Sequence, residues 1–364
     1  MSCPECLTTT QDPTLGDPTL LPDDLTLLLT TSPSPFHPST VLLSTVLESL
    51  HHAPGLAQCP LVVMFDGYRT VGEKRMKQGK VTKELADAYE EYYLAALAFL
   101  QTFAHRHPAE TYVLTTRTTR LATGATTFTT CITHTLTSTT TCHTPLTMLR
   151  FTDSIGFALA VRAGLTTHVR TRYTMVLQHD WAWVHPIPVV AIVGEMKRHA
   201  EIKYVTFPST RSLEYARRRK HNEFPDSVPC GATYAIPLTP LFFFYDRPHV
   251  CETEHYKTNV FGRGLFARGD FIEDTYSQIL VAAVKAPAKN EDKVKAWEPF
   301  GTFLYYAHEG AVRIVRHVNG RNGYLEDGKK DQWIKEGLGK KEQRARKEDD
   351  DEEQRVDWEA YLDE

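Results

Sequence analysis

The residues best suited to chemistry stand at the end of an apolar run in the stretch TRYTMVLQHDWAWV, residues 171–184. The run is built for burial as far as Leu177, and Gln178, His179 and Asp180 follow it directly. A carboxylate that holds a divalent cation stabilises the charge that develops on a diphosphate leaving group, and imidazole can share that cation. The alternative is that Asp180 caps a helix or lies solvated at a strand end. The flanking tryptophans favour a ligand site, because aromatic faces stack on nucleobases and sugar rings.

Polar groups also follow two other apolar runs. LVVMFDG ends in Asp66, and LTLLLTT is followed by a serine- and proline-rich turn. Ligands of open α/β sheets bind beyond the carboxyl ends of parallel strands. We therefore expect residues 30–34, 66–69 and 178–183 to converge on one crevice, where Asp66 accepts hydrogen bonds from a ribose or a base edge. The alternative for Asp66 is a turn-forming role in FDGY.

Hydrophobic periodicity predicts the elements that must position these residues. Apolar residues at helical spacing predict helices over residues 39–50, 83–104, 154–165, 189–200 and 271–285. Short apolar runs predict strands over residues 25–31, 61–67, 111–116, 171–184, 202–207, 303–308 and 312–318. This alternation predicts an α/β fold with a doubly wound, mostly parallel sheet and helices on both faces.

Composition predicts the domain boundaries. Residues 1–23 have the composition of a flexible N-terminal tail, residues 24–325 that of one globular domain, and residues 326–364 that of a charged C-terminal tail. A threonine-rich insertion occupies about residues 117–147, and 17 of the 34 residues from 114 to 147 are threonine. Because this segment lacks apolar periodicity, its composition favours a disordered, dispensable loop over the alternative, a β-hairpin.

Charge and cysteine usage exclude several classes of protein. The C-terminal tail holds nine Lys and Arg against fifteen Asp and Glu, a balance of −6, so the other residues carry +2 of the total charge of −4. A nearly neutral body predicts no nucleic-acid partner. The chain has no apolar run of 18 residues and no signal-peptide pattern, which predicts a cytoplasmic protein without an integral membrane segment. Seven dispersed cysteines predict free thiols, and Cys3–Cys6 lacks the second pair of a zinc finger.

Several motifs together resemble the glycosyltransferases of the GT-A fold, especially glycosyltransferase family 2-like proteins. They are the FDG strand exit, the strand T-x-Y-x-x-x-L-Q-H-D, the preceding helix with Gly156 and Ala160, and FIEDT at residues 271–275. The likeness covers about residues 24–325 apart from the insertion. It implies a GT-A-type, Rossmann-like fold, a hexosyltransferase-like activity and a nucleotide-sugar donor. The acceptor, whether glycan, protein or small molecule, stays open.

The resemblance implies roles for residues around the donor. Members of the family carry two or three aspartates where this chain has QHD, and these bind a divalent cation, Mn²⁺ or Mg²⁺, that bridges the phosphates of the nucleotide. Only Asp180 keeps the acidic pattern, and a late histidine, His317, is expected to reach back to the metal. The residues expected to bind the donor are Asp66, Gln178, Asp180 and Arg321, and those expected to bind the metal are Asp180, His317 and His179.

On the acceptor side, the resemblance places Asp274 as the general base, with Glu273 beside it in the catalytic pair. The chemistry needs such a group, because an acceptor hydroxyl is a poor nucleophile until a carboxylate takes its proton. For Glu273 the alternative is a capping box with Asp270 at the start of the predicted helix. The residues expected to contact the acceptor are Trp181, Asp246 and His249.

The resemblance thus implies an inverting, metal-dependent glycosyltransferase. The alternative, motivated by QHD in place of an acidic triplet, is a catalytically degraded GT-A domain that binds a glycan or a nucleotide without turnover. A nucleotidyltransferase is disfavoured, because the chain lacks a glycine-rich phosphate loop near its first strand.

Overall fold

The structure, a computed structural model, describes Thr19 and residues 21–33, 39–70, 80–104, 112–122, 128–138, 146–216 and 234–318. Most of the predicted N-terminal tail, the whole C-terminal tail and Arg321 lie outside these residues. Within the described part of the chain, no helix combines the length and the apolarity needed to cross a membrane.

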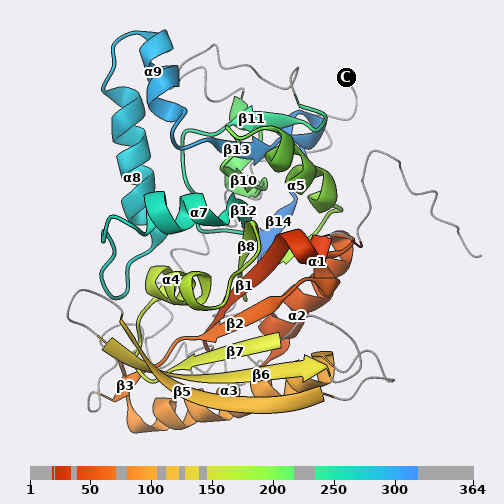
Figure 1. The fold of residues 1–364 in the computed structure, drawn as a ribbon, viewed down its shortest axis with the longest axis vertical. Coiled ribbons are helices and arrows are strands. Elements are labelled where there is room, and N and C mark those ends of the chain that lie inside the picture. The colour runs from red at the N-terminus through yellow and green to blue at the C-terminus, as the bar shows by residue number, and fades with distance from the viewer. Residues whose placement is uncertain are drawn as a thin grey trace, which may run out of the picture.

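A ten-stranded sheet runs through the molecule (Figure 1). Its strands, in spatial order, are β11 (Leu238–Pro240), β13 (Thr302–Tyr305), β10 (Tyr204–Thr206), β12 (His249–Glu252), β8 (Tyr173–Gln178), β1 (Leu25–Thr31), β2 (Leu61–Phe65), β7 (Leu146–Phe151), β6 (Phe128–Ser138) and β5 (Tyr112–Ala122). The central strands β7, β2, β1 and β8 are parallel. Antiparallel strands extend this centre on both sides, as β12 beyond β8 and β6 beyond β7.

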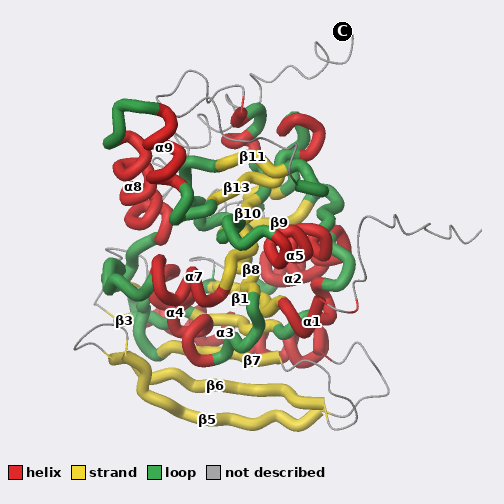
Figure 2. Tube along the Cα trace, turned by 45° about the horizontal axis from the view of Figure 1, so that its top comes forward, coloured by secondary structure: helices red, strands yellow, loops and turns green. Residues whose placement is uncertain are grey.

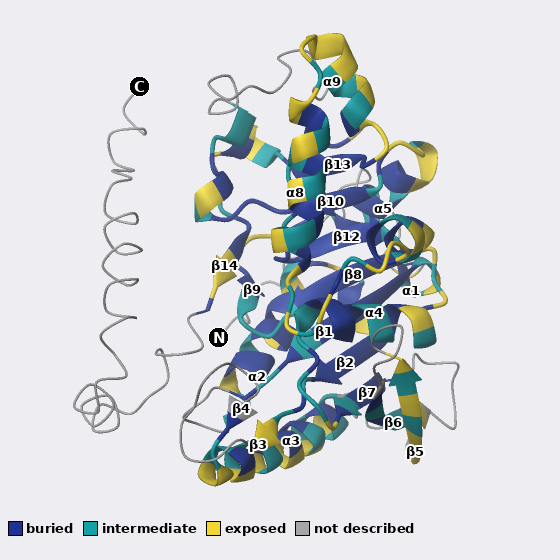
Figure 3. Ribbon diagram, turned by 90° about the vertical axis from the view of Figure 1, so that its left-hand side faces the viewer, coloured by how far each residue is buried: buried dark blue, intermediate teal, exposed yellow. Residues whose placement is uncertain are grey.

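The helices cover both faces of the sheet, which confirms the predicted α/β class. The helices are α1 (Leu21–Asp24), α2 (Val41–Ser49), α3 (Lys83–Ala104), α4 (Phe157–Thr167), α5 (Val189–Arg198), α7 (Thr253–His255), α8 (Ile272–Lys285) and α9 (Asn290–Trp297). Helices α2 and α3 lie on one face of the sheet, and α4 and α5 on the other (Figure 3), as expected for crossovers around a sheet whose strand order reverses at β1. The strands between them are buried along their length, as both faces of the central sheet are covered.

Short elements complete the structure. They are the 3₁₀ turns η3 (Leu50–His52), η4 (Leu56–Gln58), η5 (Thr210–Ser212) and η7 (Ala307–Gly310), the π turn η6 (Tyr256–Val260), and the strand pairs β3 (Arg69–Thr70) with β4 (Lys80–Val81) and β9 (Trp181–Trp183) with β14 (Val315–His317).

The threonine-rich segment is ordered where the structure describes it, so the preference for a disordered loop was wrong there. Strands β5 and β6 form a long antiparallel hairpin, and β6 also pairs with β7 at the edge of the sheet (Figure 2). Cys131 and Leu136 of β6 are buried against the core. Threonine is β-branched and suits a strand, and the missing helical periodicity excluded only a helix.

The single strand predicted over residues 171–184 is also corrected. The chain turns at His179 and Asp180, and its two halves join different sheets, β8 in the main sheet and β9 in the small pair with β14. This break matters for the site, because it leaves both polar residues at a turn at the carboxyl end of β8.

Candidate functional site

A cavity of about 650 Å³ lies at the carboxyl ends of β1, β2 and β8. All three polar strand exits contribute to it, so the predicted convergence is confirmed. The contributing side chains are Thr30, Thr31 and Ser32 after β1, Asp66 and Arg69 after β2, and Gln178, His179 and Asp180 after β8. Strand β1 has β2 on one side and β8 on the other, which makes this the switch point of the doubly wound sheet, where ligands of such folds bind.

Asp180 is oriented by a histidine from the far end of the described chain. His317 Nε2 donates a hydrogen bond to Oδ2 of Asp180 over 3.1 Å, and the backbone N–H of Val318 donates to the carbonyl of Asp180 over 2.6 Å. The pairing of β9 with β14 brings these segments together. Burial disfavours the ionised form of Asp180, but the His317 hydrogen bond and the nearby histidine charges outweigh it and lower the pKa of Asp180.

His179 lies between Asp180 and the first strand. Its backbone N–H donates to the carbonyl of Thr30 over 3.1 Å, and its side chain lines the cavity. Burial lowers the pKa of His179, and the neighbouring Asp180 opposes this only in part. His179 is therefore a neutral imidazole at neutral pH, the form that can bind a metal.

The described residues do not form a complete protein site for a metal. None of their His, Cys, Asp and Glu side chains gather in a group of three or more that could hold an ion. One oxygen of Asp180 already accepts the hydrogen bond from His317. This donor set fits a cation held mostly by phosphate oxygens of a ligand, with one carboxylate from the protein, which is a usual arrangement for Mg²⁺.

Asp66 anchors the turn that starts α4. One of its oxygens accepts the backbone N–H groups of Ile155 over 2.7 Å and Gly156 over 3.2 Å, and the other accepts the Ser154 hydroxyl over 2.9 Å. Burial raises the pKa of Asp66. The carboxylate lines the cavity as predicted, but three donors of the distant segment 154–156 already occupy it, a structural role that differs from the local turn in FDGY considered as the alternative.

At the start of α8 the structure rearranges the predicted carboxylates. The backbone N–H of Glu273 donates to Oδ1 of Asp246 over 3.1 Å, and the backbone N–H of Asp246 donates to Oε2 of Glu273 over 3.2 Å. The alternative of a capping box between Asp270 and Glu273 is therefore wrong, because Asp246 from a distant loop accepts the Glu273 N–H in place of Asp270. Burial raises the pKa of Asp246 well above its ordinary value.

The carboxylate of this segment that lies at the cavity is Asp270, whereas the prediction was Asp274. Asp270 lines the cavity, and its Oδ2 accepts the backbone N–H of Ala267 over 2.7 Å. Asp274 is exposed on α8 and is not among the residues that line the cavity. The structure thus brings a carboxylate from this segment to the site, but not the predicted one.

The predicted acceptor residues do not gather at the cavity. Trp183 is buried against Phe207, while Trp181 is partly exposed and packs edge-on against the His317 ring at 5.2 Å. Neither tryptophan lines the cavity, and neither does Asp246. Trp181 supports the ring of His317, which in turn holds Asp180.

His249 is a core histidine. It is fully buried, its Nδ1–H donates to the Arg247 carbonyl over 2.8 Å, and its Nε2 accepts the Tyr256 hydroxyl over 3.1 Å. Both ring nitrogens are satisfied, so His249 has no free group for an acceptor.

Acidification is expected to destabilise the fold through His249. Burial lowers its pKa to about 4, from an ordinary value near 6.5, so the unfolded chain binds a proton first as the pH falls. The stabilisation by neutral His249 is present above pH 6.5 and is lost as the pH falls toward 4, at a cost of about 3 kcal/mol. Imidazole NMR should show no titration of His249 between pH 6 and 7, and His249→Asn identifies its resonance. Titration in that range would contradict the assignment.

The loop before α8, residues 267–271, forms a wall of the cavity that the sequence analysis missed. Gly269 N–H donates to the Ile155 carbonyl over 3.1 Å, and Ala158 N–H donates to the Asp270 carbonyl over 3.2 Å. Gly156 lies directly against this loop, since a Cβ at residue 156 would be 2.5 Å from the Cα of Gly269. Gly156 (φ +81°) and Gly269 (φ +88°) were the residues in the sequence that could have indicated this close approach.

Gly156→Ala is expected to displace this loop. The new methyl group would meet backbone atoms, and φ +81° is unfavourable for alanine, so we expect a loss of at least about 1–2 kcal/mol of unfolding free energy. The matched control is Gly194→Ala in α5, where the nearest atom to a new Cβ is a flexible Arg198 nitrogen at 3.7 Å. That change should be neutral or stabilising. Urea unfolding of both variants measures the difference, and equal stabilities would contradict the close approach.

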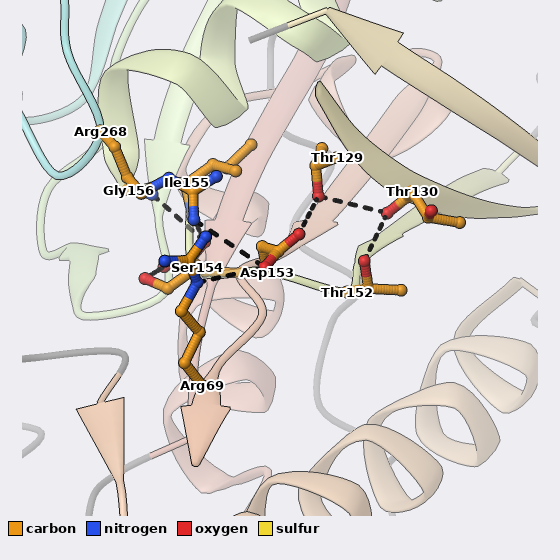
Figure 4. A network of polar contacts seen from close by, with 10 residues as sticks. Arg69, Thr129, Thr130, Thr152, Asp153, Ser154, Ile155, Gly156 and Arg268 are labelled. Carbon is orange, nitrogen blue, oxygen red and sulfur yellow. Dashed lines mark hydrogen bonds and ion pairs between the residues drawn. The ribbon is translucent and has the colours of Figure 1, made fainter. Parts of the chain in front are cut away.

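Two arginines complete the cavity on the β2 side. Arg69 Nε lies 3.2 Å from Oδ1 of Asp153, and Arg268 Nη1 lies 3.9 Å from the same oxygen (Figure 4). The other oxygen of Asp153 accepts the Thr129 hydroxyl over 3.3 Å, which ties the network to β6. These contacts join four separate segments, so no local sequence pattern signals them.

Comparison with known proteins gives one structural likeness and no match by sequence. No model of a known protein family matches the chain, and no curated protein matches it. The chain is similar to the crystal structure of mouse xyloside xylosyltransferase 1 in its apo form, at 10% identity over 79% of each chain and a TM-score of 0.26. A score this low carries no argument about activity, so the function proposed below rests on the cavity.

Proposed function

We propose that this protein is an inverting glycosyltransferase that binds a nucleotide-sugar donor in the cavity at the ends of β1, β2 and β8. One observation carries the proposal. At the switch point of the sheet, a cavity of ligand size holds a carboxylate with a lowered pKa, Asp180, which a histidine 137 residues away orients. Orienting a partly buried charge in this way costs desolvation free energy, and a ligand-binding role explains why it is maintained.

In this proposal Asp180 lies at the diphosphate of the donor. The free oxygen of Asp180 and the imidazole of His179 would hold a divalent cation together with the phosphate oxygens. When bound, such a cation supplies positive charge to the leaving diphosphate. His317 holds Asp180 in position and keeps it ionised.

The transfer also needs a proton acceptor. As the acceptor oxygen bonds to the anomeric carbon, its proton passes to a carboxylate, and the bond from the anomeric carbon to phosphate oxygen breaks with its electron pair on the diphosphate. Asp270 is the carboxylate of this segment that lines the cavity, and one of its oxygens accepts no hydrogen bond from the described residues. We therefore favour Asp270 as the general base over the family-based candidate Asp274.

A binding module without turnover is the second candidate. The lack of a three-ligand metal group among the described residues favours it. It predicts nucleotide binding at the same cavity without release of nucleoside diphosphate from any sugar donor.

A panel of nucleotide sugars incubated with the purified protein and Mn²⁺ tests the proposal. We expect one donor to release its nucleoside diphosphate. Asp270→Asn should reduce that rate by roughly 10²-fold or more, the usual scale for a lost general base. Asp292→Asn, an exposed aspartate on α9, is the control and should turn over normally.

The outcomes separate the candidates. A loss in Asp274→Asn with normal turnover in Asp270→Asn would transfer the role of base to Asp274. Tight binding of nucleotide with no turnover of any donor would support the binding module and reject the transferase.

A further inference from the structure

We infer that Arg69 and Arg268 form a phosphate-binding subsite that is separate from Asp180 and works without a metal. The inference rests on the proposed function only in treating the cavity as a ligand site. Both arginines line the cavity, one from the exit of β2 and one from the loop before α8.

The charges of this pair are only partly compensated. Both guanidinium groups share one carboxylate oxygen, Oδ1 of Asp153, at 3.2 Å and 3.9 Å. No other carboxylate of the described chain lies within ion-pair distance of either one. The two guanidinium groups therefore share a single carboxylate oxygen in direct ion-pair contact.

Hydrogen bonds to other groups of the described chain hold the neighbouring carboxylates in place. Asp66 accepts three hydrogen bonds from the turn that starts α4. The second oxygen of Asp153 accepts the Thr129 hydroxyl, and Asp270 accepts the N–H of Ala267. Buried Nη1 of Arg268 has no hydrogen-bond partner among the described residues.

The chemistry of the two side chains selects the ligand. A guanidinium group presents a planar fork of N–H donors that matches the oxygens of a phosphoryl group. Asp153 lies within ion-pair distance of both guanidinium groups, so part of the side-chain ordering is in place before a ligand binds. The ligand class is a phosphoryl group, carried by inorganic pyrophosphate or by a nucleotide.

The β2 side of the subsite, with Arg69, lies apart from Asp180. The exits of β2 and β8 are separated by β1, and two strand spacings amount to about 10 Å. The two centres can therefore contact different parts of one ligand. Binding of phosphate should have a metal-dependent part from Asp180 and a metal-independent part from the arginines.

Calorimetry in EDTA tests this directly, with inorganic pyrophosphate and a nucleoside diphosphate as probes. We expect the wild-type chain to bind both, more weakly as salt is added. Arg69→Met and Arg268→Met should each weaken binding by roughly tenfold or more, the scale of a hydrogen bond to a charged group. Arg268→Lys keeps the positive charge but loses the planar fork of donors, so its affinity for the probes should lie between those of the wild type and of Arg268→Met.

Two controls keep the outcome clear. Arg263→Met removes an exposed arginine of the same segment that does not line the cavity, and it should bind like wild type. Circular dichroism confirms that each variant is folded. Wild-type affinity in folded Arg69→Met and Arg268→Met, or no binding of either probe to the wild type in EDTA, would overturn the inference.

The results distinguish failure of the proposed function from failure of the subsite. If pyrophosphate binds through the arginines but no sugar donor is turned over, the subsite stands and the transferase does not. If a donor is turned over and the arginine variants bind pyrophosphate normally, the transferase stands and the subsite does not.

Discussion

We expect Asp180→Asn to weaken the Mn²⁺-dependent binding of a nucleoside diphosphate by roughly 10²-fold or more, since a bound cation contributes several kcal/mol of charge stabilisation. Asparagine has nearly the same shape and can still accept the hydrogen bond from His317, so the β9–β14 pair should stay intact. The loss of affinity therefore measures the effect of removing the negative charge. Titration calorimetry with and without Mn²⁺ measures it.

The EDTA arm of the same experiment is the internal control for Asp180. Without metal, Asp180→Asn should bind the nucleotide as the wild type does, because the arginine subsite is unchanged. Asp292→Asn on α9 controls for loss of an acidic side chain elsewhere. Unchanged Mn²⁺ dependence in folded Asp180→Asn would reject Asp180 as the metal and diphosphate residue.

Replacing residues 117–145 by a short Gly/Ser linker is expected to abolish soluble expression, the opposite of what composition alone predicted. The change removes β6, and β7 loses its ladder of hydrogen bonds on that side. Buried Leu146, Met148 and Phe151 of β7 would then lie on an open edge that favours aggregation. Soluble yield and thermal unfolding of the deletion measure the effect.

A matched pair of substitutions measures how much the buried side of the hairpin contributes to the unfolding free energy. Leu136 in β6 and Leu114 in β5 face each other across the hairpin, but Leu136 is buried at 3% exposure and Leu114 is 42% exposed. Leu136→Ala should cost about 2–5 kcal/mol of unfolding free energy, and Leu114→Ala should cost about 0.5 kcal/mol or less. Equal costs, or normal solubility of the deletion, would show that the hairpin adds nothing to the core.

The sequence alone determined the central elements of the fold. The predicted boundaries of β1 and α3 agree with the structure to the residue, because an apolar run and a helical period are local patterns. Strand and helix order also predicted the crevice, since parallel strands place their carboxyl ends on one side. The resemblance to GT-A proteins placed His317 at the same metal site as Asp180, and the structure brings the two side chains together through a hydrogen bond that was not predicted.

The tertiary structure decided which polar groups are free to act. Asp270 and Glu273 have the spacing of a capping box. In the structure, however, the Glu273 N–H donates to Asp246, and Asp270 lies in the cavity wall. Asp153 joins Arg69 to Arg268 across segments that share no local pattern. Periodicity and spacing act over a few residues, whereas these contacts depend on how distant loops pack at the ends of the strands. For that reason the position of the cavity and the strand exits that line it could be predicted from the sequence, while the wall before α8 and the partners of the lining groups required the folded chain.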